Sequence, residues 1–286
     1  MTPPPGRDPL PTCVDSLEPL PEEYLATVRD GLDAALHGAG GGAAGMAGVA
    51  GAAGAAGVAG AAEAGLSEAH LEAMGDHVRL LLAWNQAINL SGIREPGMIA
   101  REHVLDSLTA IPLLRWAGID DFVDLGSGGG YPGIPLAIAL PARRALLVES
   151  VAKKARFLAT AVEALGIGDR VAVFAARAEI LAADPDHRGR WGAVVARAVA
   201  DLADLAEVSL PLLRVGGILV AWKRCPLDDE IAAAEPALRQ LRGRLVAVED
   251  VTVPGLEDHV PAVVEKVAET PREFPRDPAA RRRRPL

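Results

Sequence analysis

A glycine-rich turn that links a buried strand to a helix constrains this chain more than any other feature. Residues 122–133 read Phe-Val-Asp-Leu-Gly-Ser-Gly-Gly-Gly-Tyr-Pro-Gly, so an apolar strand leads through Asp124 into a run of glycines. Glycine tolerates positive φ angles, and because it has no Cβ a ligand can approach its main chain closely. Such a turn at the carboxyl end of the first strand is where doubly wound α/β folds bind nucleotides. The segment therefore predicts an α/β fold with a cofactor at this turn.

Strand-like and helix-like segments alternate through the rest of the chain. This alternation predicts a mostly parallel, twisted sheet with helices on both faces, which is a Rossmann-like fold. The expected parallel strands are 122–125, 145–148, 171–174, 193–196 and 218–222. The expected helices are 134–140, 151–165, 179–183, 202–213 and 227–241. Two final strands, 244–253 and 259–267, should pair antiparallel and close one edge of the sheet.

Composition divides the chain into four parts. They are a low-complexity, disordered extension at 1–66, an N-terminal helical segment at 67–118, a cofactor-binding domain at 119–268 and a basic tail at 269–286. Disorder is expected because the Gly/Ala tract at 38–62 buries little apolar surface, although 22–36 has the character of a short helix. In the helical segment, Ser67 is the predicted N-cap of the first helix, and a second helix is expected at 98–114.

The formal net charge of −9 is unevenly distributed. Residues 1–66 hold eight acids and two bases, whereas the last sixteen residues hold six arginines and two acids. Such asymmetry marks either a nucleic-acid contact at one end or a solvated tail without a partner. The N-terminus has no signal-peptide pattern, the Gly/Ala tract is too poor in large apolar residues to span a membrane, and Cys13 and Cys225 form no metal pattern. We therefore expect a cytoplasmic monomer with neither a membrane segment nor a metal.

The glycine pattern itself fits two kinds of cofactor. Gly128, Gly130 and Gly133 match the G-x-G-x-x-G fingerprint of an NAD-dependent oxidoreductase. Two prolines near the helix start remove N–H donors that a pyrophosphate would need, and the Asp124 carboxylate would repel it. The alternative register, D-x-G-x-G-x-G from Asp124, resembles the first motif of S-adenosylmethionine methyltransferases. That cofactor carries an ammonium group and a sulfonium but no phosphate, so it is favoured.

Residues at the ends of the following strands complete the candidate cofactor site. Glu149 ends the second strand, where an acid can accept hydrogen bonds from both ribose hydroxyls. Ala178 and Glu179 follow the third strand, opposite the expected adenine edge, and Arg197 ends the fourth strand beside the switch point of the sheet. The loop contributes Asp124, Gly126, Gly128 and Gly130. Each acid or arginine taken alone would equally fit a surface salt bridge.

Five segments together resemble one family, the ribosomal small-subunit methyltransferase G family, also called glucose-inhibited division protein B. The segments are W-N-Q-A-I-N-L at 84–90, R-E-H-V-L-D-S at 101–107, D-L-G-S-G-G-G-Y-P-G-I-P at 124–135, A-R-A at 196–198 and the Pro- and Arg-rich ending at 271–286. The resemblance spans about residues 70–268 and the tail. It departs from the family pattern at Ala196, where a Ser is usual, at Glu149, where an Asp is often seen, and in the extension at 1–66.

The resemblance implies methyl transfer from S-adenosylmethionine to N7 of a guanine in 16S rRNA. It implies contacts with the cofactor from Gly126, Tyr131, Ala178, Glu179 and Arg197, and a partner that is 16S rRNA or the small ribosomal subunit. Guanine N7 carries an in-plane lone pair and no proton, so the enzyme mainly has to align the reactants. We therefore assign no catalytic acid or base.

Cations and two polar helix residues are the candidates for RNA contact. They are Arg101, His103, Asp106, Lys153, Lys154, Lys223, Arg281, Arg282, Arg283 and Arg284. His103 and Asp106 share one helical face, either as a packed structural pair or as part of the substrate side. Three other functions stay open: a methyltransferase of the same fold acting on a small molecule or protein, an NAD-dependent oxidoreductase, and a binding module without activity.

Overall fold

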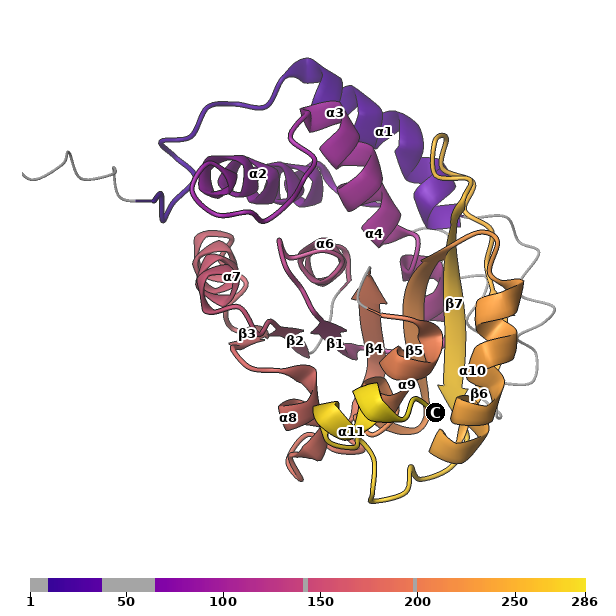
Figure 1. Ribbon diagram of the computed structural model, residues 1–286. Helices are drawn as coiled ribbons and strands as arrows, with labels where there is room; N and C mark the ends of the chain where they lie inside the picture. Colours follow the sequence, from indigo (N-terminus) through magenta and orange to yellow (C-terminus); the bar gives the residue numbers. More distant parts are fainter. Residues whose placement is uncertain (1–9, 38–64, 141–143, 198–199) are drawn as a thin grey trace, which may run out of the picture.

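The computed structural model describes residues 10–37, 65–140, 144–197 and 200–286, which form one twisted sheet with helices on both faces (Figure 1). Seven strands of these residues lie in the order β3-β2-β1-β4-β5-β7-β6. They are β1 Asp121–Leu125, β2 Arg144–Val148, β3 Val171–Phe174, β4 Trp191–Arg197, β5 Leu213–Arg224, β6 Gly243–Val248 and β7 His259–Lys266. β1 to β5 pair parallel, and β7 pairs antiparallel with β5 and β6. The predicted fold class and the antiparallel edge pair are confirmed.

Each inner strand sends alternate side chains to two separate cores, as the pleat of a sheet requires. Phe122 on β1 and Val195 on β4 enter one core, which helices α2, α6 and α7 cover. Their neighbours Val123 and Val194 enter the other core, which α8, α9 and α10 cover. The two faces of the sheet are therefore both buried, and the inner strands read as continuous apolar runs.

Most helices follow the predicted segments. They are α6 Gly133–Ala139, α7 Ala152–Ala164, α8 Ala178–Ala183, α9 Leu202–Ser209 and α10 Asp228–Leu241. The tail adds a helix that was not predicted, α11 Pro278–Arg283. Three boundaries differ from the prediction by four residues or more. β5 begins at Leu213, so α9 ends at Ser209 rather than at 213, because a short apolar run satisfies helix and strand patterns alike. β6 ends at Val248 rather than at 253, where the chain leaves the sheet at two acids.

The N-terminal helical layer begins with α2, Glu68–Asn85. Ser67 is its N-cap, as predicted, and forms a reciprocal capping box with His70. The second helix, expected at 98–114, is wrong as a single element. The chain forms α3 Pro96–Ile99, a π-helical segment Ala100–Leu105, α4 Asp106–Leu108 and α5 Ile111–Trp116. Pro112 lies in the first turn of α5, where its missing N–H is tolerated, so a new helix starts there instead of continuing the old one.

The described part of the extension is ordered and packed, which corrects the prediction of disorder for residues 10–37. Helix α1, Glu22–His37, lies beside α3 and the π-helical segment (Figure 1). Its Tyr24 and Val28 are 0% and 1% exposed, since they lie one helical turn apart on the buried face. The indole of Trp84 donates a 2.8 Å hydrogen bond to the Pro11 carbonyl and ties the preceding segment to α2. Residues 1–9 and 38–64 of the predicted extension lie outside the described residues.

Among the described residues, no helix combines the length and apolar character needed to cross a membrane.

Candidate active site

The glycine loop leaves β1 at the point where the strand order reverses. β1 pairs with β2 on one side and β4 on the other, which defines the switch point where ligands bind in open α/β sheets. Gly126, Gly128 and Gly130 all have positive φ, at 75°, 55° and 90°. The N–H groups of Gly126 and Ser127 both donate to the Val148 carbonyl, at 2.9 and 3.0 Å. The loop is therefore held against β2 with its backbone turned toward the carboxyl edge of the sheet.

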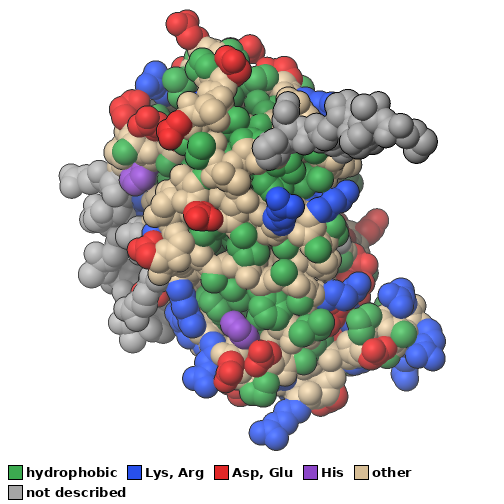
Figure 2. Space-filling model, turned by 90° about the vertical axis from the view of Figure 1, so that its left-hand side faces the viewer, with side chains coloured by type: hydrophobic (Ala, Val, Ile, Leu, Met, Phe, Trp, Pro, Cys, Tyr) green, Lys and Arg blue, Asp and Glu red, His purple; other side chains and the backbone are tan. Residues whose placement is uncertain are grey.

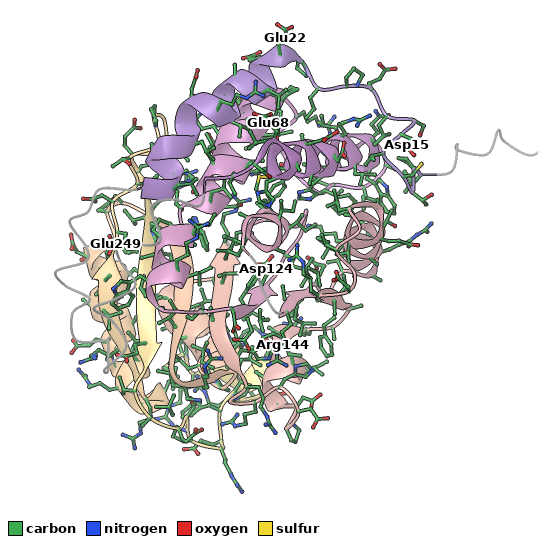
Figure 3. The ribbon with its side chains drawn as sticks, turned by 180° about the vertical axis from the view of Figure 1, so that it is seen from behind. Asp15, Glu22, Glu68, Asp124, Arg144 and Glu249 are labelled. Carbon is green, nitrogen blue, oxygen red and sulfur yellow. The ribbon has the colours of Figure 1, made fainter. Side chains whose placement is uncertain are left out.

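Asp124 lies beneath the loop and between the sheet and α6 (Figure 3). Its carboxylate is fully buried, and Oδ2 accepts a 3.0 Å hydrogen bond from the Gly133 N–H at the start of α6. A Cβ on Gly133 would lie 2.5 Å from that oxygen, so this contact requires glycine. Burial raises the pKa of Asp124 to about 7. The sequence suggested that this acid faces the cofactor, whereas the structure places it as a support under the loop.

Glu149 fastens the other side of the loop. Its Oε2 accepts a 3.0 Å hydrogen bond from the Gly128 N–H, and its Oε1 accepts a 2.7 Å bond from the Val151 N–H at the start of α7. The side chain is 6% exposed. A carboxylate has about four acceptor sites, so two backbone donors leave capacity for ribose hydroxyls. The structure thus brings Glu149 to the glycine loop, as the strand spacing predicted.

A cavity of about 260 Å³ opens beside the loop, and we call it the loop pocket. Gly126 forms its floor, and Ala178 and Glu179 line it from the first turn of α8. Arg281, from the C-terminal tail, also lines it, together with Asp204 of α9. The sequence assigned Arg281 to RNA contact, and its place here could not be read from the chain, because 102 residues separate it from its partner Glu179.

A second cavity of about 590 Å³ adjoins the loop pocket, and we call it the wide pocket. The two cavities share Ala200 and Leu205 in their walls, so they are direct neighbours. The polar and aromatic lining of the wide pocket comprises Glu102, His103, Asp106, Arg197, Trp222, Lys223, Arg224 and His259. Arg197 lies in this wall and not in that of the loop pocket, although the family resemblance implied a direct cofactor contact.

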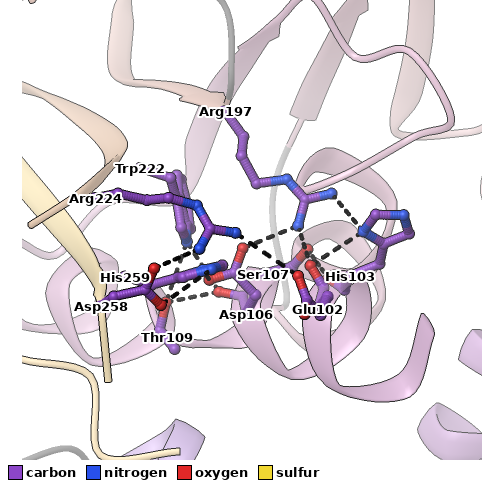
Figure 4. Close-up of polar contacts among 10 residues, drawn as sticks. All are labelled: Glu102, His103, Asp106, Ser107, Thr109, Arg197, Trp222, Arg224, Asp258 and His259. Atoms are coloured by element: carbon purple, nitrogen blue, oxygen red, sulfur yellow. Dashed lines mark hydrogen bonds and ion pairs between the residues drawn. The ribbon is translucent and has the colours of Figure 1, made fainter. Parts of the chain in front are cut away.

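Asp106 organises the wall of the wide pocket (Figure 4). It is fully buried, and its Oδ2 accepts a 2.9 Å bond from Arg197 while its Oδ1 lies 2.8 Å from Nδ1 of His259. Its backbone carbonyl accepts a 2.9 Å bond from the indole of Trp222. A buried carboxylate with two such partners is strongly fixed, because removing either partner would leave an uncompensated charge. Asp106 and His103, left open by the sequence as a structural pair or as substrate-side residues, both line this pocket.

His103 connects this wall to the glycine loop. Its Nδ1 lies 3.0 Å from the Glu102 carbonyl and 3.2 Å from the Arg197 guanidinium, and its Nε2 lies 2.7 Å from the Ser91 hydroxyl. Burial and the charge of Arg197 lower the pKa of His103 to about 4. The ring also lies 4.8 Å from that of Tyr131 between centroids. A neutral imidazole therefore borders the wide pocket at physiological pH.

Two histidine rings, those of His77 and His103, pack against Tyr131. His77 was not predicted from the sequence. His77 of α2 lies 4.6 Å from Tyr131 between ring centroids, opposite His103 at 4.8 Å. Its Nε2 lies 2.8 Å from the Gly129 carbonyl, so the buried ring holds the glycine loop from outside. Burial lowers the pKa of His77 to about 4. The only signal in the sequence is a histidine on the apolar face of a helix, which equally fits an ordinary core residue.

The remaining RNA candidates do not gather in one place. Lys223 is held by Glu230 at 2.5 Å and by the Ala200 carbonyl at 2.6 Å at the rim of the wide pocket. Arg282 and Arg283 are exposed on α11, as is Lys153 on α7. Arg101, Lys154 and Arg284 complete this dispersed set; the first two are half-buried and the third is exposed. Figure 2 shows Lys and Arg side chains spread over one face, with acidic side chains concentrated at its upper end. Within the described residues, no group of His, Cys, Asp and Glu is arranged to hold a metal ion.

The loop pocket fits S-adenosylmethionine. Gly126 lines it without a Cβ, and Glu179 offers an acceptor for an amino group. Glu149 does not line the pocket itself, but it is bound to the Gly128 N–H of the loop beside it and retains acceptor capacity for a ribose. Three features define a class I S-adenosylmethionine-dependent methyltransferase. They are the glycine loop, the acid that follows β2, and the position of both at the switch point of the sheet.

Comparison with known proteins narrows this class. Residues 70–257 match the family model "rRNA small subunit methyltransferase G". The ribosomal RNA small subunit methyltransferase G of Roseiflexus sp. (strain RS-1) is 44% identical to this chain, over 77% of this chain and 94% of the relative. The protein of the same name from Halalkalibacterium halodurans is 36% identical, over 77% of this chain and 93% of the relative. A solved geranyl diphosphate C-methyltransferase from Streptomyces coelicolor A3(2), in complex with S-adenosyl-L-homocysteine, is 20% identical, with a TM-score of 0.45, over 63% of this chain and 86% of that one. The chain belongs to the rRNA small subunit methyltransferase G family.

Proposed function

We propose that this protein transfers the methyl group of S-adenosylmethionine to N7 of a guanine in 16S rRNA. The observation that carries the proposal is a pair of neighbouring pockets: the loop pocket beside the glycine loop shares two wall residues with a wide pocket large enough for a flipped-out base. Family membership supports the ribosomal RNA of the small subunit as the substrate. We place the reaction in the cytoplasm, with the small subunit or its RNA as the partner.

The geometry suits a reaction that needs alignment rather than proton transfer. When bound, S-adenosylmethionine supplies a methyl group on a sulfonium, and attack by N7 leaves S-adenosylhomocysteine. N7 has no proton to lose, so no general base is required, and His103 is already occupied at Nδ1 by Arg197. The neutral ring of His103 lines the wide pocket next to the ring of Tyr131, and it carries no charge that would repel a cationic sulfur. Fixing both reactants in this way can supply several kcal/mol of the barrier reduction.

Arg197 and its neighbours give the wide pocket its polarity. Guanine presents two acceptors, N7 and O6, on its major-groove edge. Arg197 and Lys223 place donors in the pocket wall, and Trp222 contributes part of a ring surface. We propose that these donors bind O6, so that the base is oriented with the N7 lone pair free and facing the loop pocket. Lys223 is held by Glu230, which restricts it to the rim.

Nucleoside mass spectrometry of 16S rRNA tests the proposal. A strain lacking this gene should lose one 7-methylguanosine, and the wild-type gene should restore it, whereas a gene encoding Arg197→Ala should not. Retention of every 7-methylguanosine in the deletion strain would refute the substrate assignment. In that case, transfer of a labelled methyl group to metabolites or proteins, but not to small subunits, would identify the alternative substrate class on the same fold.

A further inference from the structure

The tail residue Arg281 lies inside the loop pocket. Its side chain is 11% exposed, and its Nη1 is 3.0 Å from Oε1 of Glu179. Its Nη2 donates to the Asp204 carbonyl at 2.9 Å. Glu179 is in the first turn of α8 and Asp204 in the first turn of α9. One guanidinium therefore bridges the two helices that flank the pocket, and it does so from a third element, α11 (Figure 1).

The tail that carries Arg281 is anchored in the domain by buried polar contacts. Glu207 of α9 is 1% exposed, and its Oε1 accepts bonds from the backbone N–H and Nε of Arg276 at 2.8 and 2.9 Å. Its Oε2 accepts a third bond from the Arg276 guanidinium at 2.6 Å. Arg188 donates to the carbonyls of Thr270 and Phe274 at 2.9 and 2.6 Å. Charge-assisted bonds of this kind are about twice as strong as neutral ones, so they fix the path of the tail beside the pocket.

We propose that Arg281 is a positioning residue of the cofactor site, which holds the Glu179 carboxylate for the amino group of the adenine ring. The inference rests on the cofactor placement proposed above. Arg281 and Arg177 both contact Oε1 of Glu179, at 3.0 and 3.4 Å, so neither arginine uses Oε2. Oε2 is the oxygen that can accept from an amino group in the pocket. By bridging Glu179 to Asp204, Arg281 also fixes the width of the pocket at this end.

The helix α11 then serves two ligands from two sides. Arg281 turns inward, whereas Arg282 and Arg283 are exposed. The sequence assigned the whole basic run to RNA contact. In this proposal Arg281 supports the cofactor site, while the exposed Arg282 and Arg283 can contact RNA phosphates. The two roles can be separated by single substitutions in adjacent positions.

Calorimetric titration of the full chain with S-adenosylhomocysteine tests the proposal. Arg281→Ala should weaken binding at least tenfold, because a charge-assisted contact to a pocket carboxylate is lost. Arg281→Lys should recover part of the affinity, since it keeps the charge but not the bridge. The matched control, Arg282→Ala, should bind as the wild type does. Circular dichroism of each variant verifies the fold, and Arg281→Lys carries the test if the alanine variant does not fold.

A cofactor analogue distinguishes two explanations for weaker binding by Arg281→Ala: a misplaced Glu179 carboxylate, or a tail that is loosened as a whole. The analogue of S-adenosylhomocysteine that carries unsubstituted purine in place of adenine has no amino group and no other N–H on that edge of the ring, so it cannot donate to Glu179. The loss caused by Arg281→Ala should therefore be several-fold smaller for this analogue than for S-adenosylhomocysteine. Equal losses for both ligands, or unchanged affinity in Arg281→Ala, would overturn the proposal. If the wild type itself failed to bind S-adenosylhomocysteine, the cofactor placement would be wrong instead.

Discussion

At the scale of single residues, the loop glycines combine two requirements. Their positive φ angles cost about 1–2 kcal/mol for a residue with a side chain. Gly126 also lines the loop pocket, so a Cβ there would enter the space of the cofactor. Backbone strain and blocking of the cofactor space can be measured separately. A side chain at another glycine with positive φ, such as Gly166, would cause the strain alone, because no atom lies within 4 Å of an added Cβ there.

Gly126→Ala should lower the free energy of unfolding by about 1 kcal/mol and weaken binding of S-adenosylhomocysteine at least tenfold. Gly166→Ala, with a φ of 64°, should show the same loss of stability and normal binding. Urea denaturation and calorimetry measure the two effects. Normal affinity in Gly126→Ala would show that the cofactor does not approach this part of the loop.

His77 predicts a pH dependence of stability. Burial, partly offset by the hydrogen bond to Gly129, lowers its pKa from 6.5 to about 4. Between these values the unfolded chain binds a proton that the folded chain excludes, so the stability present above pH 6.5 is lost as the pH falls toward 4. His77→Gln should abolish up to about 3 kcal/mol of this loss, while His103 keeps its own contribution in both proteins.

Urea denaturation of the wild type and His77→Gln at pH 7 and pH 4.5 measures this difference. The glutamine can still donate to the Gly129 carbonyl, so the variant should fold and retain the loop. An unchanged acid sensitivity in the variant would mean that the imidazole is already protonated in the folded state.

At the scale of elements, helix α1 is a structural part of the fold and not a tether. Its buried residues pack against the layer that carries His103 and Asp106, since α1 contacts the π-helical segment directly. The π-helical segment itself holds Arg101 to His103, and such segments often occur at functional sites because they re-aim side chains. Substitutions that disturb the packing of α1 should therefore displace side chains that line the wide pocket.

Val28→Asp should destabilise the protein by about 3 kcal/mol or more, because it buries a charge without a partner on a position that is 1% exposed. Ala26→Asp is the matched control on the exposed face of the same helix and should change stability by less than about 0.5 kcal/mol. Thermal and urea unfolding distinguish the two. Equal stability of both variants would show that α1 does not pack as described.

At the scale of the whole molecule, a net charge of −9 means that RNA binding must depend on local clusters of cations. The exposed arginines of α11 form such a cluster beside the cofactor pocket. Their contribution should appear in the salt dependence of binding, because each phosphate contact releases counterions.

The triple variant Arg282→Gln, Arg283→Gln and Arg284→Gln should weaken binding to small ribosomal subunits or 16S rRNA. It should reduce the slope of log affinity against log salt by about 2, while binding of S-adenosylhomocysteine stays normal. Arg239→Gln, an exposed and paired arginine on α10, is the control and should leave the slope unchanged. Filter binding over a range of salt concentrations gives both slopes. An unaltered slope in the triple variant would exclude the tail from RNA contact.

Sequence patterns predicted the strands well because strands buried on both faces read as uninterrupted apolar runs. β1, β2 and β4 extend beyond their predicted segments by only a few residues. β3 matches its predicted segment although it is a partly buried edge strand, because its four residues are all apolar. The glycine loop and Glu149 were also predicted, since parallel strands bring their carboxyl ends to one edge whatever the loops do. These features depend on the local apolar pattern, which neighbouring residues determine, and on the right-handed crossover that parallel strands share in nearly all proteins.

Only the tertiary structure decided which long-range partners meet. It turned Asp124 under the loop, brought His77 against the Gly129 carbonyl, packed α1 on the helical layer and placed Arg281 beside Glu179. Each of these depends on side chains that lie far apart in the chain and on how completely the fold removes them from water. A charge pattern gives the same reading for a solvated arginine and for one that bridges two helices, and burial is what distinguishes them.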